Sequence, residues 1–215
     1  MITALAAAVV VPHLLWAQRL LNHLQPADNS YGRRPTVVLW RGVDGAARSQ
    51  NRSDCSSFLT ALLRQAYGLD GDDIQAWLGA HAPRAVDYHR AIMRGDRFIR
   101  IHRIADLVPG DLLVSRYLNR RSGATGHMML VAEQPRLVGR CSPSVCLFRI
   151  PVIDSARSGH GPTDRRQGKG GVGRGIIQVQ TSLDGRLLTY RWSERASSRW
   201  RSTDQESLVA GRFSW

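Results

Sequence analysis

The period of the hydrophobic pattern changes near residue 98, and this change constrains the fold more than any other feature of the chain. Before it, the pattern is helical. Ser53 or Asp54 can cap a helix in which apolar residues recur at helical spacing until Gly68, which can end it. Residues 72–80 and 84–94 are predicted to form further helices.

After residue 98 the apolar residues form short runs that are rich in β-branched and aromatic side chains and are separated by turn signals. Asp184-Gly185 is typical of a tight hairpin turn. Helices followed by consecutive strands predict an α+β domain, with N-terminal helices packed on a five- to six-stranded antiparallel sheet. The predicted strands are residues 111–117, 127–133, 146–154, 175–183 and 186–192.

The length of 215 residues and the 43% hydrophobic content suit one globular domain, predicted over residues 26–215. Residues 1–25 are predicted to be an N-terminal apolar helix or an atypical export signal. No basic residue precedes their apolar stretch, and His13 and Arg19 interrupt it, so it is too short to span a bilayer. We expect export to the periplasm or cell envelope, with a cytoplasmic location as the alternative.

The chain is strongly basic, because its 30 basic residues exceed its 17 acidic residues and give a formal net charge of +13. All of the basic residues are arginine except Lys169. This surplus favours contact with an anionic polymer such as an acidic wall component. The arginines are spread along the whole chain instead of forming one stripe, so a nucleic-acid partner is not expected.

The three cysteines differ in their surroundings. Cys141 and Cys146 flank Ser-Pro-Ser, so they can close a hairpin tip as a disulfide or remain two free thiols. Cys55 is left without a partner, at the first turn of the predicted helix. It is either a small buried hydrophobe or a nucleophile.

Two other polar residues stand at the ends of apolar elements and favour the interpretation of Cys55 as a nucleophile. His127 begins one predicted strand, and Asp154 ends the next, so antiparallel pairing brings them together. A helix N-terminus favours a thiolate and offers N–H groups to an oxyanion. An imidazole can then move the proton and a carboxylate can orient the imidazole. His160 is the alternative third residue.

The other histidines and acids show no spacing typical of metal ligands, so no metal or other cofactor is expected. The Gly- and Arg-rich segment 157–175 has two interpretations. It is a basic flap over the active site that grips an anionic substrate, or it is a surface insertion.

Three segments resemble motifs of the NlpC/P60 family. SDCSSFLTALLRQAYG is similar to the family's nucleophile motif, LVPGDLLVSRY to its Pro-Gly-Asp-Leu strand, and GHMMLVAEQ to its Gly-His strand. The resemblance covers residues 50–155. Ser57 stands where the family usually has Gly. The family also has a Tyr and a Trp-Gly-Gly segment upstream of the nucleophile, and here only Tyr31 and Trp40-Arg41-Gly42 are similar to them.

This resemblance implies a papain-like NlpC/P60 fold and a cysteine peptidase or amidase that cleaves peptidoglycan stem peptides or related short peptides. The acyl-enzyme would form on Cys55, with His127 as base and Asp154 as orienting group. The resemblance further implies that Asp54, Ser56, Trp40 and Tyr31 line the substrate pocket. Two alternatives are a non-catalytic wall-binding or scaffold protein on the same fold, and an acyltransferase or amidase that acts on a non-wall substrate.

Overall fold

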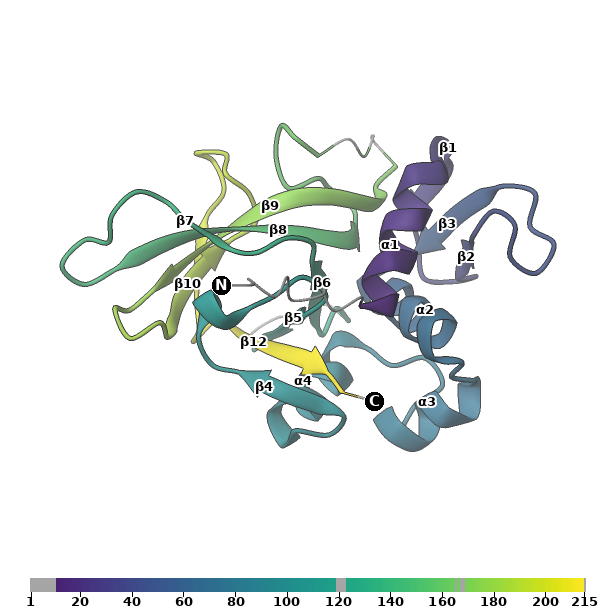
Figure 1. Cartoon of the computed structure of the whole chain (residues 1–215), viewed down its shortest axis with the longest axis horizontal. Coiled ribbons are helices and arrows are strands. Elements are labelled where there is room, and N and C mark those ends of the chain that lie inside the picture. Colours follow the sequence, from purple (N-terminus) through teal and green to yellow (C-terminus); the bar gives the residue numbers. More distant parts are fainter. Residues whose placement is uncertain (1–10, 119–122, 165, 167–168, 215) are drawn as a thin grey trace, which may run out of the picture.

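A computed structural model describes residues 11–118, 123–164, 166 and 169–214 (Figure 1). The first half of the chain contains α1 (Pro12–His23), β1 (Leu24–Tyr31), β2 (Val37–Leu39), β3 (Ser49–Ser53), α2 (Cys55–Tyr67), α3 (Gly71–Leu78), α4 (Ala85–Arg94) and β4 (Phe98–Ile101). The second half contains a short 3-10 turn (Ile104–Asp106), β5 (Leu112–Tyr117), β6 (Gly126–Val131), β7 (Arg136–Leu137), β8 (Cys146–Ala156), β9 (Gly171–Thr181), β10 (Leu187–Arg191), β11 (Trp200–Ser202) and β12 (Glu206–Phe213).

Nine strands of the described residues form one antiparallel sheet. Eight follow the order β11-β10-β9-β8-β6-β5-β12-β4, and β7 pairs with β8 beside this path. β8 and β9 are the longest pair and run together from Cys146 opposite Thr181 to Ala156 opposite Gly171. Asp154 therefore lies near the end of β8 where the chain leaves for the segment that returns as β9.

The predicted architecture is wrong. Helices packed on a five- to six-stranded sheet in a papain-like arrangement were expected, whereas the described residues form a nine-stranded sheet and a separate three-stranded sheet. Strand accounts for 37% of the chain and helix for 23%. The reason is that strands also form where the sequence has no apolar alternation, and that the C-terminal segment adds β12 between β5 and β4.

The three-stranded sheet occupies a segment that looks like a loop in sequence. β3 pairs in parallel with β1 and antiparallel with β2. β1 and β3 are largely polar, although β2 is apolar, and side-chain hydrogen bonds supplement the backbone ladder. The Asn51 Nδ2 group donates to Asn29 Oδ1 at 2.9 Å and to the Ser30 carbonyl at 3.1 Å. This sheet leads the chain directly into α2.

The large sheet buries apolar side chains on both faces. Leu112 and Leu130 belong to the core that it shares with the four helices. Leu113 and Met129, their chain neighbours, belong to a second core together with residues of β8, β9 and β10. One apolar cluster thus joins the central strands to the outer ones, which requires the sheet to curl over it, as Figure 1 shows.

Residues 1–25 are predicted to form an apolar helix or an export signal. Within this segment the structure has α1, and residues 1–10 lie outside the described residues. Leu14, Ala17 and Leu20 of α1 share the core of α2. None of the helices in the described ranges is long and apolar enough to cross a membrane. Cys141 and Cys146, the first residue of β8, form a disulfide.

We expect Gly126→Ala to destabilise the fold, because β6 approaches β5 closely at this point. A Cβ atom at Gly126 would lie 1.8 Å from the Ser115 carbonyl oxygen, and this backbone atom cannot move aside without disturbing the sheet. Overpacking of this kind should lower the free energy of unfolding by about 3 kcal/mol. Denaturant unfolding measures the loss.

Gly123→Ala is the matched control, since a Cβ there meets no atom within 4 Å. An equal loss of stability in both variants would contradict the packing of β6 on β5.

Candidate active site

Cys55 is the first residue of α2, and the structure of the preceding turn holds it there. Asp54 caps the helix: its Oδ1 accepts from the Ser57 backbone N–H at 2.8 Å, and the Ser57 hydroxyl accepts from the Asp54 backbone N–H at 2.9 Å. The N–H groups of Cys55 and Ser56 therefore belong to the first helical turn, where no intrahelical acceptor exists. The Cys55 thiol is free and only 7% exposed.

His127 faces this helix from the second position of β6. Its backbone N–H donates to the Ser115 hydroxyl at 3.1 Å, and the residue is buried. The imidazole Nε2 lies 2.5 Å from Asp154 Oδ2. The side chains of His127 and Cys55 also share a hydrogen bond. Because Nε2 is engaged by Asp154, Nδ1 is the nitrogen left for the thiol.

The charge of Cys55 controls the protonation of this histidine. Burial alone would lower the pKa of His127, but the negative charge of Cys55 and hydrogen bonds to Asp154 and Cys55 outweigh it and raise the pKa to about 10. The imidazolium form of His127 is the state that these interactions stabilise.

Asp154 is fully buried and is surrounded by cations. Besides His127, its Oδ2 lies 3.0 Å from His160 Nε2, and its Oδ1 accepts from Arg166 Nη2 at 2.7 Å. Burial alone would raise the pKa of this carboxyl, but the charges of His160 and Arg166 and the hydrogen bonds from both histidines hold the pKa well below its usual range. Asp154 is therefore ionised in the folded protein.

His160 supports Asp154 and does not replace it. Its Nδ1 lies 2.8 Å from the Trp192 carbonyl oxygen while its Nε2 faces Asp154. Both ring nitrogens thus face oxygen atoms, which fixes the orientation of the ring. The sequence presents Asp154 and His160 as alternatives for the third position, and the structure brings them into contact.

The described part of segment 157–175 folds back beneath the site. Arg166 bridges Asp154 and Asp164, with Nη2 2.8 Å from Asp164 Oδ2, and both side chains of this second pair are almost completely buried. Asp164 Oδ2 also accepts from the His160 backbone N–H at 3.0 Å. Neither interpretation of the segment, as a flap or as a surface insertion, anticipates this buried support.

The strand that leads into Cys55 is tied to the strand that carries Asp154. The Ser155 hydroxyl donates to the Ser53 carbonyl at 2.6 Å. A second connection joins β1 to β9. The Asn29 side chain accepts from the Val172 backbone N–H at 2.9 Å and donates to the Val172 carbonyl at 2.8 Å. These bonds fix the position of the small sheet, and hence of the thiol, relative to β8 and β9.

The predicted pocket residues separate into two groups. Tyr31 and Asp54 line a pocket beside Cys55, and the Ser56 hydroxyl donates to Asp54 Oδ1 at 3.1 Å. Trp40 is not part of this group. It is buried in the core, where its indole N–H donates to the Trp16 carbonyl at 2.8 Å.

Sequence reasoning missed three contributors to the site. Trp192 packs edge-on against the His127 ring with centroids 4.6 Å apart and over the His160 ring at 4.1 Å. Arg33 pairs with Asp54 at 3.0 Å, and Arg166 pairs with Asp154. Trp192 is distant in sequence from both histidines. Arg33 and Arg166 are two of many arginines, and nothing in the local sequence distinguishes them from the others.

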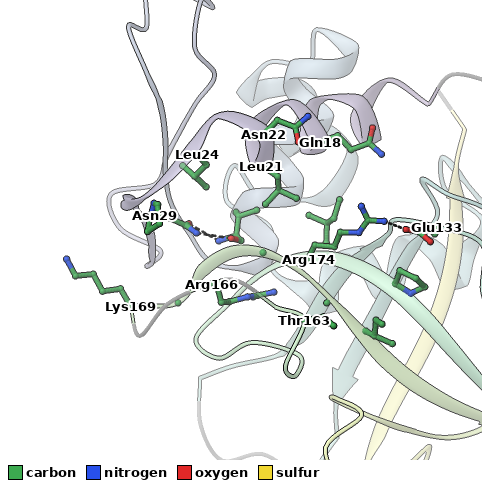
Figure 2. Close-up of a pocket in the computed structure, with 18 of the residues that line it drawn as sticks. Gln18, Leu21, Asn22, Leu24, Asn29, Glu133, Thr163, Arg166, Lys169 and Arg174 are labelled. Carbon is green, nitrogen blue, oxygen red and sulfur yellow. Dashed lines mark hydrogen bonds and ion pairs between the residues drawn. The ribbon is translucent and has the colours of Figure 1, made fainter.

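A larger groove of about 1280 Å³ lies elsewhere, and neither Cys55 nor His127 lines it. Figure 2 shows it between α1 and the β8–β9 pair, with Leu21 and Asn22 on the helical side and Arg174, paired with Glu133, on the sheet side. Lys169 stands at its edge and also lines the pocket beside Cys55. Among the residues whose placement is described, no cluster of histidine, cysteine and acidic side chains could hold a metal ion.

The chain is similar to the uncharacterized protein "R653" of Acanthamoeba polyphaga mimivirus. The two are 30% identical over 216 residues, which covers 93% of this chain and 95% of the viral protein. No family model matches the sequence, and no solved structure is detectably similar to it. The resemblance to NlpC/P60 motifs is therefore untested by these comparisons and stays a prediction.

We expect histidine NMR titrations to separate two buried imidazoles. His127 should titrate near pH 10, whereas burial and the charges of Arg116 and Arg100 lower the pKa of His89 to about 4. In Cys55→Ser the negative charge beside His127 is removed, so its midpoint should fall while that of His89 stays. A His127 midpoint that is unchanged in Cys55→Ser would show that the thiol does not carry the charge.

Proposed function

The chain belongs to the family of the mimivirus protein "R653", whose name states no activity, and from its own site we propose that it is a cysteine hydrolase that cleaves amide bonds through an acyl-enzyme. The observation that carries this proposal is the alignment of three groups. Cys55 at a helix N-terminus shares a hydrogen bond with His127, and His127 is held by Asp154 at 2.5 Å.

Acylation follows from this geometry. The Cys55 thiolate attacks the amide carbonyl carbon, and the electron pair of the C=O bond moves to oxygen. N–H groups of the first turn of α2 donate to the resulting oxyanion. The His127 imidazolium then gives its proton to the leaving nitrogen, so that the C–N bond breaks, an amine departs and a thioester remains on Cys55.

Deacylation reverses these roles. Neutral His127 takes a proton from water as the water oxygen attacks the thioester carbon. Collapse of the second tetrahedral intermediate releases the carboxylic acid and restores the thiolate and the imidazolium. Asp154 stays ionised throughout and keeps His127 in the orientation that serves both steps. The sequence of steps needs no cofactor.

His160 and Arg166 act through Asp154. A buried carboxylate without partners would take up a proton and lose its hold on an imidazolium. The bonds from His160 at 3.0 Å and from Arg166 at 2.7 Å supply the charge that keeps it ionised. We assign both as positioning residues.

For the substrate we propose a short peptide, with stem peptides of peptidoglycan as the first candidate. The motifs shared with NlpC/P60 proteins support this choice. The excess of basic residues over the chain also supports contact with an anionic polymer. Nucleic acid is not proposed as a partner.

The disulfide between Cys141 and Cys146 supports a location outside the reducing cytosol, because such bonds persist in oxidising compartments. We accordingly propose that the protein is exported to the periplasm or cell envelope.

Two other functions would use the same site differently. An acyltransferase or amidase would form the same thioester but pass the acyl group to an acceptor other than water, or act on a non-wall amide. A scaffold protein would bind without turnover. The interaction of Cys55 with a histidine whose pKa is raised and which Asp154 orients favours catalysis, because perturbed histidines of this kind are typical of active sites.

We expect Cys55→Ala to abolish cleavage of muropeptides, and His127→Ala to reduce it at least about 1000-fold, since nucleophile and base act as a unit. Chromatography of the products with mass detection measures both. His81→Ala is the matched control, because His81 is exposed, contacts the Gly71 carbonyl at the start of α3 and should leave the rate unchanged.

Cleavage retained in Cys55→Ala would overturn the proposed nucleophile. The wild-type protein could also fail to cleave any muropeptide while Cys55 still forms a thioester with an activated ester. This result would contradict the proposed wall substrate but not the proposed acyl-enzyme mechanism.

A further inference from the structure

A pocket of about 460 Å³ opens beside the thiol, and most of its charged side chains are cations. We call it the basic pocket. Its lining residues are Tyr31, Gly32, Arg33, Asp54, Arg157 and Lys169. Cys55 does not itself line the pocket, but it follows Asp54 in the chain and interacts electrostatically with Tyr31, so the pocket lies near the nucleophile.

The three cations are not equivalent. Arg33 is neutralised by Asp54 at 3.0 Å and also donates to the Ala82 carbonyl at 2.9 Å. Arg157 and Lys169, by contrast, have no ion pair with any carboxylate in the described ranges of the chain. Both side chains are exposed at the pocket. Two uncompensated positive charges thus face the space beside the nucleophile.

The pocket wall holds these charges in place. The Arg157 guanidinium lies over the Tyr31 ring, 5.5 Å from its centroid, and bonds its hydroxyl. The backbone N–H of Tyr31 donates to the Lys169 carbonyl at 3.1 Å, which fixes the chain at Lys169 against β1. Tyr31 is also electrostatically coupled to Cys55 and Asp54, which raise the pKa of its hydroxyl in addition to the effect of burial. Tyr31 therefore contacts Arg157 and also interacts electrostatically with Cys55.

We propose that the basic pocket binds a carboxylate carried by the substrate beside the scissile amide, with Arg157 and Lys169 as its ligands. This inference rests on the proposed hydrolase function. It narrows the substrate class from short peptides in general to acidic ones whose free carboxylate lies next to the bond that is cut. The planar fork of Arg157 suits a carboxylate, and Lys169 adds a mobile second charge.

A pair of alkylating reagents tests the pocket without a known substrate. Iodoacetate carries a carboxylate and iodoacetamide is its neutral counterpart, and both alkylate Cys55 by displacing iodide. We compare the ratio of the two rate constants in the wild type, Arg157→Gln and Lys169→Gln. The His127 imidazolium attracts iodoacetate in all of these proteins, so the change in the ratio between variants is the quantity that reports on the pocket.

Each neutral variant should lower the iodoacetate-to-iodoacetamide ratio about fivefold, as expected for one charge several ångströms from the bound anion near the protein surface. The change should shrink at high salt. Lys169→Arg, which keeps the charge, should restore the wild-type ratio. Arg186→Gln is the matched control: it removes one charge from the distant β9–β10 hairpin, where Arg186 pairs with Asp184, and should leave the ratio unchanged.

Three outcomes would overturn the proposed carboxylate site, and they differ in whether they also contradict the proposed hydrolase function. An unchanged ratio in Arg157→Gln and Lys169→Gln, with rapid iodoacetamide alkylation of Cys55, removes the carboxylate site and leaves the hydrolase. Alkylation by both reagents no faster than that of a buried thiol removes the proposed function as well. Stronger protection of Cys55 by inorganic phosphate than by acetate assigns the pocket to phosphoryl groups.

Discussion

The buried carboxylate of Asp154 is the charge on which the rest of the site depends. An isolated carboxylate in this position would cost several kcal/mol of desolvation free energy, so the fold must bring cations to it. His127 comes from β6, and His160 and Arg166 come from the segment that follows β8. Asp164 adds a second carboxylate to Arg166. Arg166 thus bridges two buried carboxylates, and both histidines contact Asp154.

The segment between β8 and β9 contributes both to the support of Asp154 and to the basic pocket. Between β8 and β9 the chain first supplies Arg157 to the basic pocket, then passes behind Asp154 with His160 and Arg166, and returns to the pocket at Lys169. Catalytic support and substrate recognition are thus coupled through a short stretch of chain. A change in the part that supports Asp154 would displace the cations that bind substrate, and the reverse also holds.

The grouping of the three residues could be predicted from sequence because each stands at the end of a strongly patterned element: Cys55 at a helix start, His127 at a strand start and Asp154 at a strand end. The architecture could not. β1 and β3 are polar strands stabilised by bonds such as Asn51 to Asn29, and no periodicity distinguishes them from loops. Trp192 was missed because its contacts with His127 and His160 are distant in sequence, and Arg166 was missed because it is one of many arginines. Trp40 looked like a pocket residue but fills the core beneath α1.

The most direct test of the account is the ultraviolet absorbance of the thiolate at neutral pH, measured as the difference between the wild type and Cys55→Ser. The account predicts one thiolate per chain, and it predicts that His127→Ala loses this absorbance because the imidazolium partner is gone. Absence of thiolate absorbance in the wild type, or its persistence in His127→Ala, would contradict the ion pair and with it the mechanism built on Cys55.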